Sequence, residues 1–151
     1  MKLLFTLVLI MTNLMSWTFT KEDFDSLNED QKEVLRMAKA IGHKYDLGNV
    51  LVQIAVVETR LGKISDRSSK QFCGPMQISI KYAKVSCNAL NDNLYLSMEY
   101  AAREILKWYD IHKSMSKAIM FYNTGYIKTD YGAVYLARAN LVGKVLEEVD
   151  L

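Results

Sequence analysis

The chain has 151 residues, of which 50% are hydrophobic and 24% are charged. This balance is that of a globular protein and excludes disorder over the whole length. Nineteen basic and seventeen acidic residues give a net charge of +2, which excludes a strongly basic nucleic-acid binder. Seven glycines and a single proline leave few turn residues for a β-sandwich. We therefore expect a mainly helical protein.

The first twenty residues differ in composition from the rest of the chain. Lys2 is the one charged residue among them, and an apolar run at 3–19 follows it before Lys21. This layout is typical of a secretory signal. As a helix the run reaches ~26 Å, slightly short of a ~30 Å hydrocarbon core, and it lacks an Ala-x-Ala cleavage motif. We expect residues 1–20 to be a cleaved signal peptide or an uncleaved signal anchor. Residues 21–151 would then be an exported domain, periplasmic or tethered to the inner membrane and facing the periplasm.

The two cysteines, Cys73 and Cys87, lie fourteen residues apart and form no Cys-x-x-Cys motif. In an oxidising compartment an even pair at this spacing favours one structural disulfide, with two separate buried thiols as the alternative. His43 and His112 have no partner at the spacing of metal ligands. We therefore expect neither a metal site nor a cofactor.

Helical periodicity begins near residue 26. The spacing of Ser26–Glu29 predicts a capping box, and the apolar residues behind it predict a helix that reaches Tyr45. Asn49 is expected to begin the next helix, which stops near Gly62. After a polar loop, Pro75 is expected at the first position of a short helix.

Three further helical blocks are expected, and they begin at Asp92 or Asn93, at Ser114 or Ser116, and at Thr129 or Gly132. The last block runs to Val149 and is expected to turn Leu141 and Val142 inward. Strict β alternation, internal repeats and linkers are absent from the sequence. Residues 21–151 are therefore expected to form one helical domain.

Glu58 is a carboxylate at an apolar position of the second expected helix. It shares a helical face with four apolar residues between Leu51 and Leu61. Desolvation on such a face raises the pKa of a carboxyl group, which lets the group keep its proton near neutral pH and act as a general acid. The alternative is a glutamate that reaches solvent at the helix end or pairs with Arg60 or Lys63, although both of these point to other faces.

Three short segments occur in a recognisable order. They are ETRLGK at 58–63, CGPMQIS at 73–79 and FYNTG at 121–125. Their order and spacing resemble the catalytic domain of lytic transglycosylases, the SLT or goose-lysozyme-like branch of the lysozyme superfamily. The resemblance extends over about residues 35–146 and implies a lysozyme-like helical domain.

The resemblance also implies roles for particular residues. Glu58 matches the catalytic acid/base of the family. Met76 and Gln77 match the residues that line the sugar groove beside it. Tyr122 and Asn123 match the pair that positions the carboxyl group and the N-acetyl group of the substrate.

Tyr135 resembles the later tyrosine that hydrogen-bonds near the catalytic glutamate, and Tyr131 competes for this role. Three positions depart from the family pattern. Thr59 stands where serine is usual, Pro75 replaces a leucine, and Phe121 replaces a small alanine. The last two substitutions are expected to reshape the sugar groove.

The implied reaction is cleavage of the β-1,4 bond between N-acetylmuramic acid and N-acetylglucosamine in peptidoglycan. The family needs no second carboxylate, because the substrate's own acetamido and 6-hydroxyl groups take part, and the product carries a 1,6-anhydro end. If Asp66 holds a water, the protein would instead be a hydrolytic muramidase, as in lysozymes and phage endolysins. A non-catalytic peptidoglycan-binding assembly factor is the alternative from another class.

Peptidoglycan glycan strands are therefore the expected partner, with neither nucleic acid nor any contact to a membrane beyond the N-terminal segment. A secretion, conjugation or phage lysis apparatus is a possible second partner. Aromatic side chains that could contact sugars are Trp108, Tyr109, Tyr122, Tyr131 and Tyr135.

Overall fold

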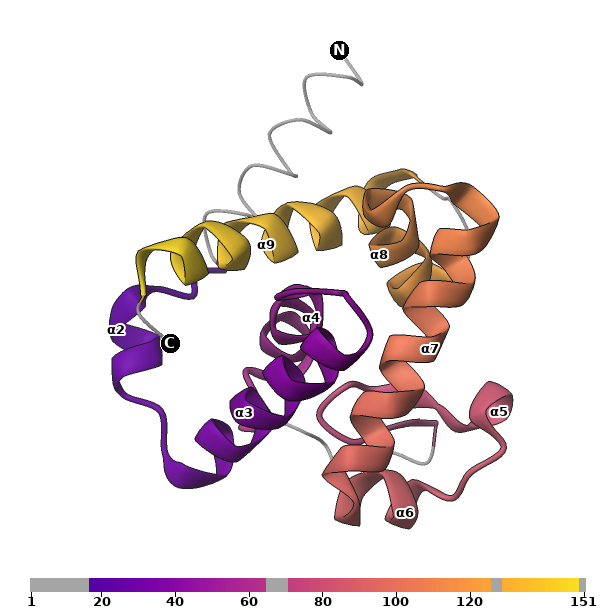
Figure 1. Ribbon diagram of the computed structural model, residues 1–151, viewed down its shortest axis with the longest axis horizontal. Helices are drawn as coiled ribbons and strands as arrows, with labels where there is room; N and C mark the ends of the chain where they lie inside the picture. The colour runs from indigo at the N-terminus through magenta and orange to yellow at the C-terminus, as the bar shows by residue number, and fades with distance from the viewer. Residues whose placement is uncertain (1–16, 65–70, 126–128, 150–151) are drawn as a thin grey trace.

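The expected mainly α class is confirmed. The computed structural model describes residues 17–64, 71–125 and 129–149 (Figure 1). Its elements are α2 (Lys21–Asp25), α3 (Glu29–Lys44), α4 (Val50–Thr59), β1 (Phe72–Cys73), β2 (Ile78–Ser79), α5 (Ile80–Ala83), α6 (Cys87–Asp92), α7 (Leu94–His112), α8 (Met115–Thr124) and α9 (Thr129–Glu148). The two strands pair antiparallel, with Phe72 opposite Ser79.

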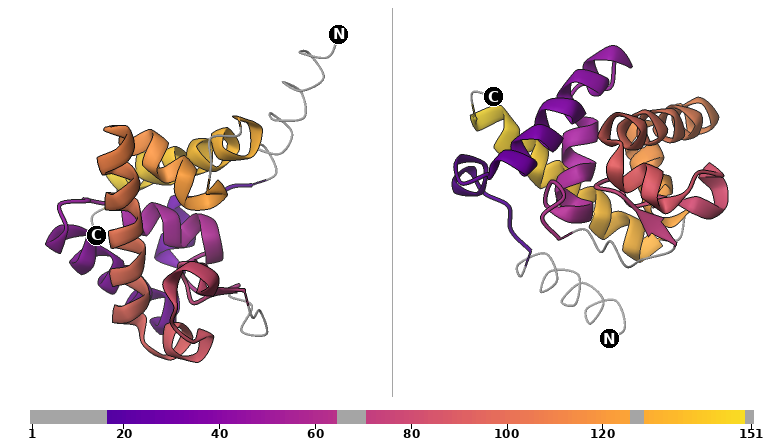
Figure 2. Two further views of the ribbon diagram at one scale, coloured as in Figure 1. Left: turned by 90° about the vertical axis from the view of Figure 1, so that its right-hand side faces the viewer. Right: turned by 90° about the horizontal axis from the view of Figure 1, so that it is seen from below.

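Helix α4 is the central element. It packs against α3, α7 and α9, which surround it in the views of Figures 1 and 2. Five of its residues are fully buried, namely Leu51, Val52, Ile54, Ala55 and Val56. The helix is therefore apolar on most of its circumference rather than on the one expected face, as is typical of a helix inside a core. Glu58 is its one charged residue.

The predicted start of α3 was wrong by two residues. Asn28 is the N-cap and accepts a hydrogen bond from the Gln31 N–H at 2.9 Å, while the Gln31 side chain accepts from the Asn28 N–H at 3.3 Å. Ser26 instead ends α2, a one-turn helix that begins at the N-cap Thr20. Periodicity gave no sign of α2 because one turn is too short to show a repeat.

Two later caps are confirmed. Asn93 accepts a hydrogen bond from the Leu96 N–H at 2.9 Å and begins α7, and Ser114 begins α8. In α9, Val142 is fully buried as expected, but Leu141 is 42% exposed, so its predicted inward position was wrong. The buried face of α9 instead includes Ala139, and Leu141 lies off this face.

Pro75 does not begin a helix. It lies in the turn that joins β1 to β2, where the Gln77 N–H donates to the Gly74 carbonyl at 3.0 Å. Proline is favoured at the second position of such a turn as well as at a helix start. Each strand has two residues, too few for alternation to be visible in the sequence.

Contacts of the folded domain begin before residue 21. The Phe19 ring is buried at 4.8 Å from the ring of Phe24, and the Thr18 carbonyl accepts a hydrogen bond from Arg60 at 3.1 Å. The rest of the predicted export segment, residues 1–16, lies outside the described residues. Within the described ranges, none of the helices combines the length and apolar character that a membrane span requires.

A buried carboxylate that sequence analysis did not identify links α7 to α3. Glu99 is 6% exposed and bonded to Lys44 and to the hydroxyls of Tyr45 at 2.5 Å and Tyr95 at 2.8 Å. Arg103 adds a hydrogen bond at 3.2 Å. The hydrogen bonds from Lys44, Tyr45 and Tyr95, with Lys44 the largest influence, lower the pKa of Glu99 from 4.5 to about 2.

Replacing Glu99 by Gln is expected to lower the free energy of unfolding at pH 7 by about 2 kcal/mol, the range of hydrogen bonds to a charged group. Because the folded pKa is lowered, this stabilisation is present above pH 4.5 and is lost as the pH falls toward 2. Urea unfolding at pH 7 and pH 3 measures the effect, which should shrink at pH 3. Glu104→Gln, which removes an exposed Lys107 pair on the same helix, is the control and should change stability little.

Candidate active site

Glu58 is the penultimate residue of α4, at the point where the helix stops. The next residues, Arg60 and Leu61, both have left-handed backbones with φ of +50° and +59°, so the helix cannot continue. The Glu58 side chain is half-buried. The carboxyl group therefore lies at the edge of the core rather than in open solvent.

Two side chains from distant parts of the sequence bind this carboxyl group. The Tyr135 hydroxyl, on α9, donates to Glu58 Oε1 at 2.8 Å, and the Asn123 side chain, near the end of α8, adds a second hydrogen bond. Tyr135 is 6% exposed, whereas Tyr131 is 84% exposed. Of the two tyrosines that compete in the sequence, Tyr135 is the one that contacts Glu58.

Burial is the main influence on the titration of Glu58. It raises the pKa of the carboxyl group from 4.5 to about 7, and the hydrogen bonds from Tyr135 and Asn123 limit the rise. Burial and the nearby Glu58 charge raise the pKa of the Tyr135 phenol well above its usual range. Tyr135 therefore remains a donor, while Glu58 can gain and lose a proton near neutral pH.

The alternative pairing of Glu58 with Arg60 does not occur. The Arg60 guanidinium donates to the Thr18 carbonyl at 3.1 Å and lies 4.0 Å from Asp23. Among the described residues, no charged group contributes to the pKa shift of Glu58. Asp66, the candidate for a second carboxylate, lies outside the described residues.

The β1–β2 turn is fastened to the end of α4 and to α8. The Thr59 hydroxyl donates to the Pro75 carbonyl at 2.8 Å, and the Tyr122 hydroxyl donates to the Met76 carbonyl at 2.6 Å. The Thr59 oxygen also accepts a hydrogen bond from the Gly62 N–H at 2.8 Å. The Thr59 hydroxyl thus ties the turn to the residue after Glu58.

The two predicted groove residues in this turn differ in exposure. The Met76 side chain is fully buried, so it contacts the core, and only its carbonyl is engaged by Tyr122. Gln77 is half-buried, and its side-chain amide donates to the Gly74 carbonyl at 3.0 Å. Both residues therefore help to hold the β1–β2 turn in place.

The predicted disulfide is confirmed. Cys73 and Cys87 are bonded, with their Cα atoms 5.4 Å apart, and this bond joins the last residue of β1 to the first residue of α6. Gly74 follows directly, with φ of +73°, and a Cβ there would lie 2.8 Å from the Leu90 carbonyl oxygen and from Ser97 Oγ. Only glycine fits this contact, so the turn is held closely against α6 and α7.

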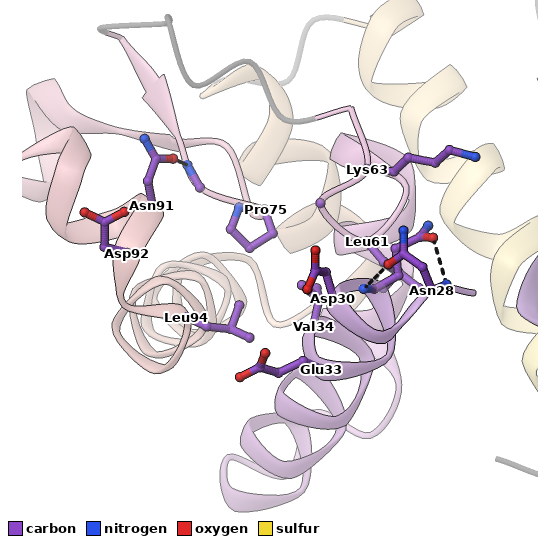
Figure 3. Close-up of a pocket in the computed structure, with 13 residues that line it drawn as sticks. Asn28, Asp30, Glu33, Val34, Leu61, Lys63, Pro75, Asn91, Asp92 and Leu94 are labelled. Carbon is purple, nitrogen blue, oxygen red and sulfur yellow. Dashed lines mark hydrogen bonds between the residues drawn. The ribbon is translucent and has the colours of Figure 1, made fainter.

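A cavity of about 550 Å³ lies on another side of this turn (Figure 3). Figure 3 shows Asp30 and Glu33 of α3 across the cavity from Asp92, with Pro75 and Leu94 between them. Neither Glu58 nor its hydrogen-bond partners line it. We therefore place the candidate active site at Glu58 and not in this cavity.

Trp108 is a packing residue rather than an exposed sugar platform. Its ring stacks on Phe121 at 4.6 Å between centroids, and His112 stacks on the same Phe121 ring at 4.2 Å. Phe121 thus fills the space between α7 and α8.

Comparison of the chain with protein-family models, curated proteins and solved structures gives no significant match. Within the described ranges, no cluster of three or more His, Cys, Asp or Glu side chains is arranged to hold a metal ion. The function must therefore be argued from the site itself.

Replacing Tyr135 by Phe is expected to raise the pKa of Glu58 above 7, because the lost hydrogen bond favours the ionised carboxylate. Titration of the glutamate carboxyl carbons by NMR measures this change. Tyr131→Phe removes an exposed hydroxyl from the same helix and is the matched control. An unchanged Glu58 titration in Tyr135→Phe would show that this hydrogen bond is not formed in solution.

Proposed function

We propose that the protein cleaves the β-1,4 bond between N-acetylmuramic acid and N-acetylglucosamine in peptidoglycan, as a lytic transglycosylase with Glu58 as general acid and base. The observation that carries the proposal is the half-buried Glu58 carboxyl group with a pKa of about 7 and two hydrogen-bond donors. A carboxyl group with this pKa can hold a proton for a leaving group and take one back at neutral pH.

In the first step, protonated Glu58 gives its proton to the glycosidic oxygen as the bond from this oxygen to the muramic acid C1 breaks. The acetamido oxygen of the same sugar stabilises the positive charge at C1. In the second step, ionised Glu58 takes the proton of the 6-hydroxyl group, whose oxygen bonds to C1. Glu58 is protonated again, no water is consumed, and the product has a 1,6-anhydro end.

Two residues of the protein and one property of the substrate support these two steps. The Tyr135 hydroxyl holds one carboxyl oxygen of Glu58 in position. The exposed Asn123 amide is available to the substrate beside Glu58. The 6-hydroxyl of the same sugar has a large proximity advantage over free water.

The test is digestion of purified peptidoglycan with the full-length chain, followed by mass spectrometry of the released muropeptides. Products lighter by one water than those of a muramidase support the transglycosylase reaction. Products of hydrolytic mass would identify a muramidase and direct attention to Asp66. Binding without any release would favour a non-catalytic assembly factor.

The proposed setting is the periplasm, reached through the N-terminal segment, where the substrate is located and where a disulfide is stable. We propose that the protein acts with an apparatus for secretion, conjugation or phage lysis, since such an apparatus needs a local opening in the cell wall. Fractionation of cells that express the full-length chain tests this setting.

A further inference from the structure

The aromatic side chains that sequence analysis proposed for sugar contact fall into two groups in the structure. Tyr135 is buried, Tyr122 is half-buried with its hydroxyl bonded inside the protein, and Trp108 stacks on Phe121. Tyr109 and Tyr131 are 38% and 84% exposed and belong to neither hydrophobic cluster, and of these two only Tyr131 lies on the same helix as Tyr135. Tyr131 is therefore the exposed ring nearest in the chain to a residue that contacts Glu58. Its ring is therefore available to a ligand.

The position of Tyr131 is set by Tyr135. Both lie on α9, four residues apart, so they share one face of the helix about 5–6 Å from one another at Cβ. Tyr135 donates to the Glu58 carboxyl group, and Tyr131 lies one helical turn before Tyr135 with its side chain exposed to solvent. Asn123 is exposed, and its side chain also bonds Glu58. It lies near the end of α8, a few residues before α9 begins.

We propose that the Tyr131 ring is a stacking platform for the saccharide unit next to the bond that Glu58 cleaves. This proposal rests on the proposed function and adds the residue that fixes how the glycan strand lies across the site. A pyranose ring has an apolar face of C–H groups and a polar edge of hydroxyls. The tyrosine ring and its hydroxyl match this pattern, since they combine an apolar body with a polar tip.

The contribution of Tyr131 is to binding and not to the reacting atoms. Its loss should therefore raise KM and leave kcat nearly unchanged. Because the ring is largely exposed, its loss should also leave the melting temperature nearly unchanged. These two readouts separate a binding role from a structural one.

The experiment compares Tyr131→Ala and Tyr131→Phe in the full-length chain, with Tyr82→Ala as the matched control. Tyr82 is 75% exposed and lies on α5, beside the N-terminal end of α7, whereas α9 lies beyond the other end of α7 (Figure 1).

Binding of hexa-N-acetylchitohexaose is measured by titration calorimetry in the Glu58→Gln background, and KM for peptidoglycan is measured with Glu58 present. Tyr131→Ala is expected to weaken binding and raise KM about tenfold, as the loss of one aromatic contact would. Tyr131→Phe and Tyr82→Ala should stay within twofold of the parent protein.

The outcomes distinguish a failure of the stacking role from a failure of the proposed reaction. If the protein cleaves peptidoglycan and Tyr131→Ala has an unchanged KM and an unchanged affinity, the stacking role is wrong and the proposed function stands. If nothing is cleaved but chitohexaose binding depends on Tyr131, the stacking role stands and the proposed reaction fails. If the parent protein neither binds nor cleaves, both proposals are overturned.

Discussion

Glu58→Gln is expected to lower the rate of peptidoglycan cleavage on the order of 10³-fold while keeping the fold intact. The amide has nearly the shape of the carboxyl group but cannot give or take the proton. Muropeptide release from purified peptidoglycan measures the rate. Activity within tenfold of the parent protein would remove Glu58 from the general acid role.

The same substitution is expected to stabilise the protein at pH 8 by about 2 kcal/mol, because ionised Glu58 is desolvated in the fold. A raised folded pKa means that the folded state holds the proton more tightly than the unfolded chain. The destabilising effect of Glu58 therefore grows between pH 4.5 and pH 7, is constant above this range, and vanishes at pH 4. Melting temperatures of both proteins at pH 4 and pH 8 test this sign.

Glu147→Gln, an exposed carboxylate on α9, is the control for both measurements. It should change neither the cleavage rate nor the pH dependence of the melting temperature. If Glu58→Gln is instead less stable than the parent protein at pH 8, the buried carboxyl group has a structural role that the proposed function does not include.

Removal of the disulfide is the second change with a large expected effect. Replacing Cys73 and Cys87 by Ala is expected to lower the free energy of unfolding by about 3 kcal/mol, the value for a loop of this length. The helix signal in circular dichroism should change little at 20 °C, because the long helices lie outside this loop. Thermal unfolding followed by circular dichroism measures the loss.

Cleavage activity is expected to fall more than helix content, because the disulfide anchors the turn whose carbonyls bond Thr59 and Tyr122. Reduction of the parent protein should reproduce the effect, and reductant should leave the Ala variant unchanged. Equal activity with and without the bonded disulfide would show that the hydrogen bonds alone hold the turn.

The helical class, the helix starts at Asn93 and Ser114, and the position of Glu58 in an apolar pattern were all predictable from the sequence. These features are local, since they depend on periodicity, capping side chains and turn residues that lie a few positions apart. The cysteine pair was also predictable, because only two cysteines exist and one pairing is possible.

The predictions for two local structures were wrong because the same residue type is compatible with two different structures. Pro75 suits both a helix start and the second position of a turn, and the neighbouring left-handed Gly74 and Gln77 decided for the turn. Ser26 and Asn28 are both acceptable N-caps. Because Ser26 ends α2, a helix that the sequence pattern did not reveal, Asn28 is the residue that caps α3.

The partners of Glu58 depend on helix packing and could not be predicted from local patterns in the sequence. Tyr131 and Tyr135 are chemically identical, and one helical turn separates a buried hydrogen-bond donor from an exposed ring. Tyr95 and Arg103 lie four residues before and after Glu99 on α7, but Lys44 and Tyr45 reach it from the end of α3, more than fifty residues earlier in the chain. The physical reason is that desolvation and hydrogen bonding depend on distances across the core. These distances are set by how α4, α8 and α9 pack, and no single segment of the chain contains them.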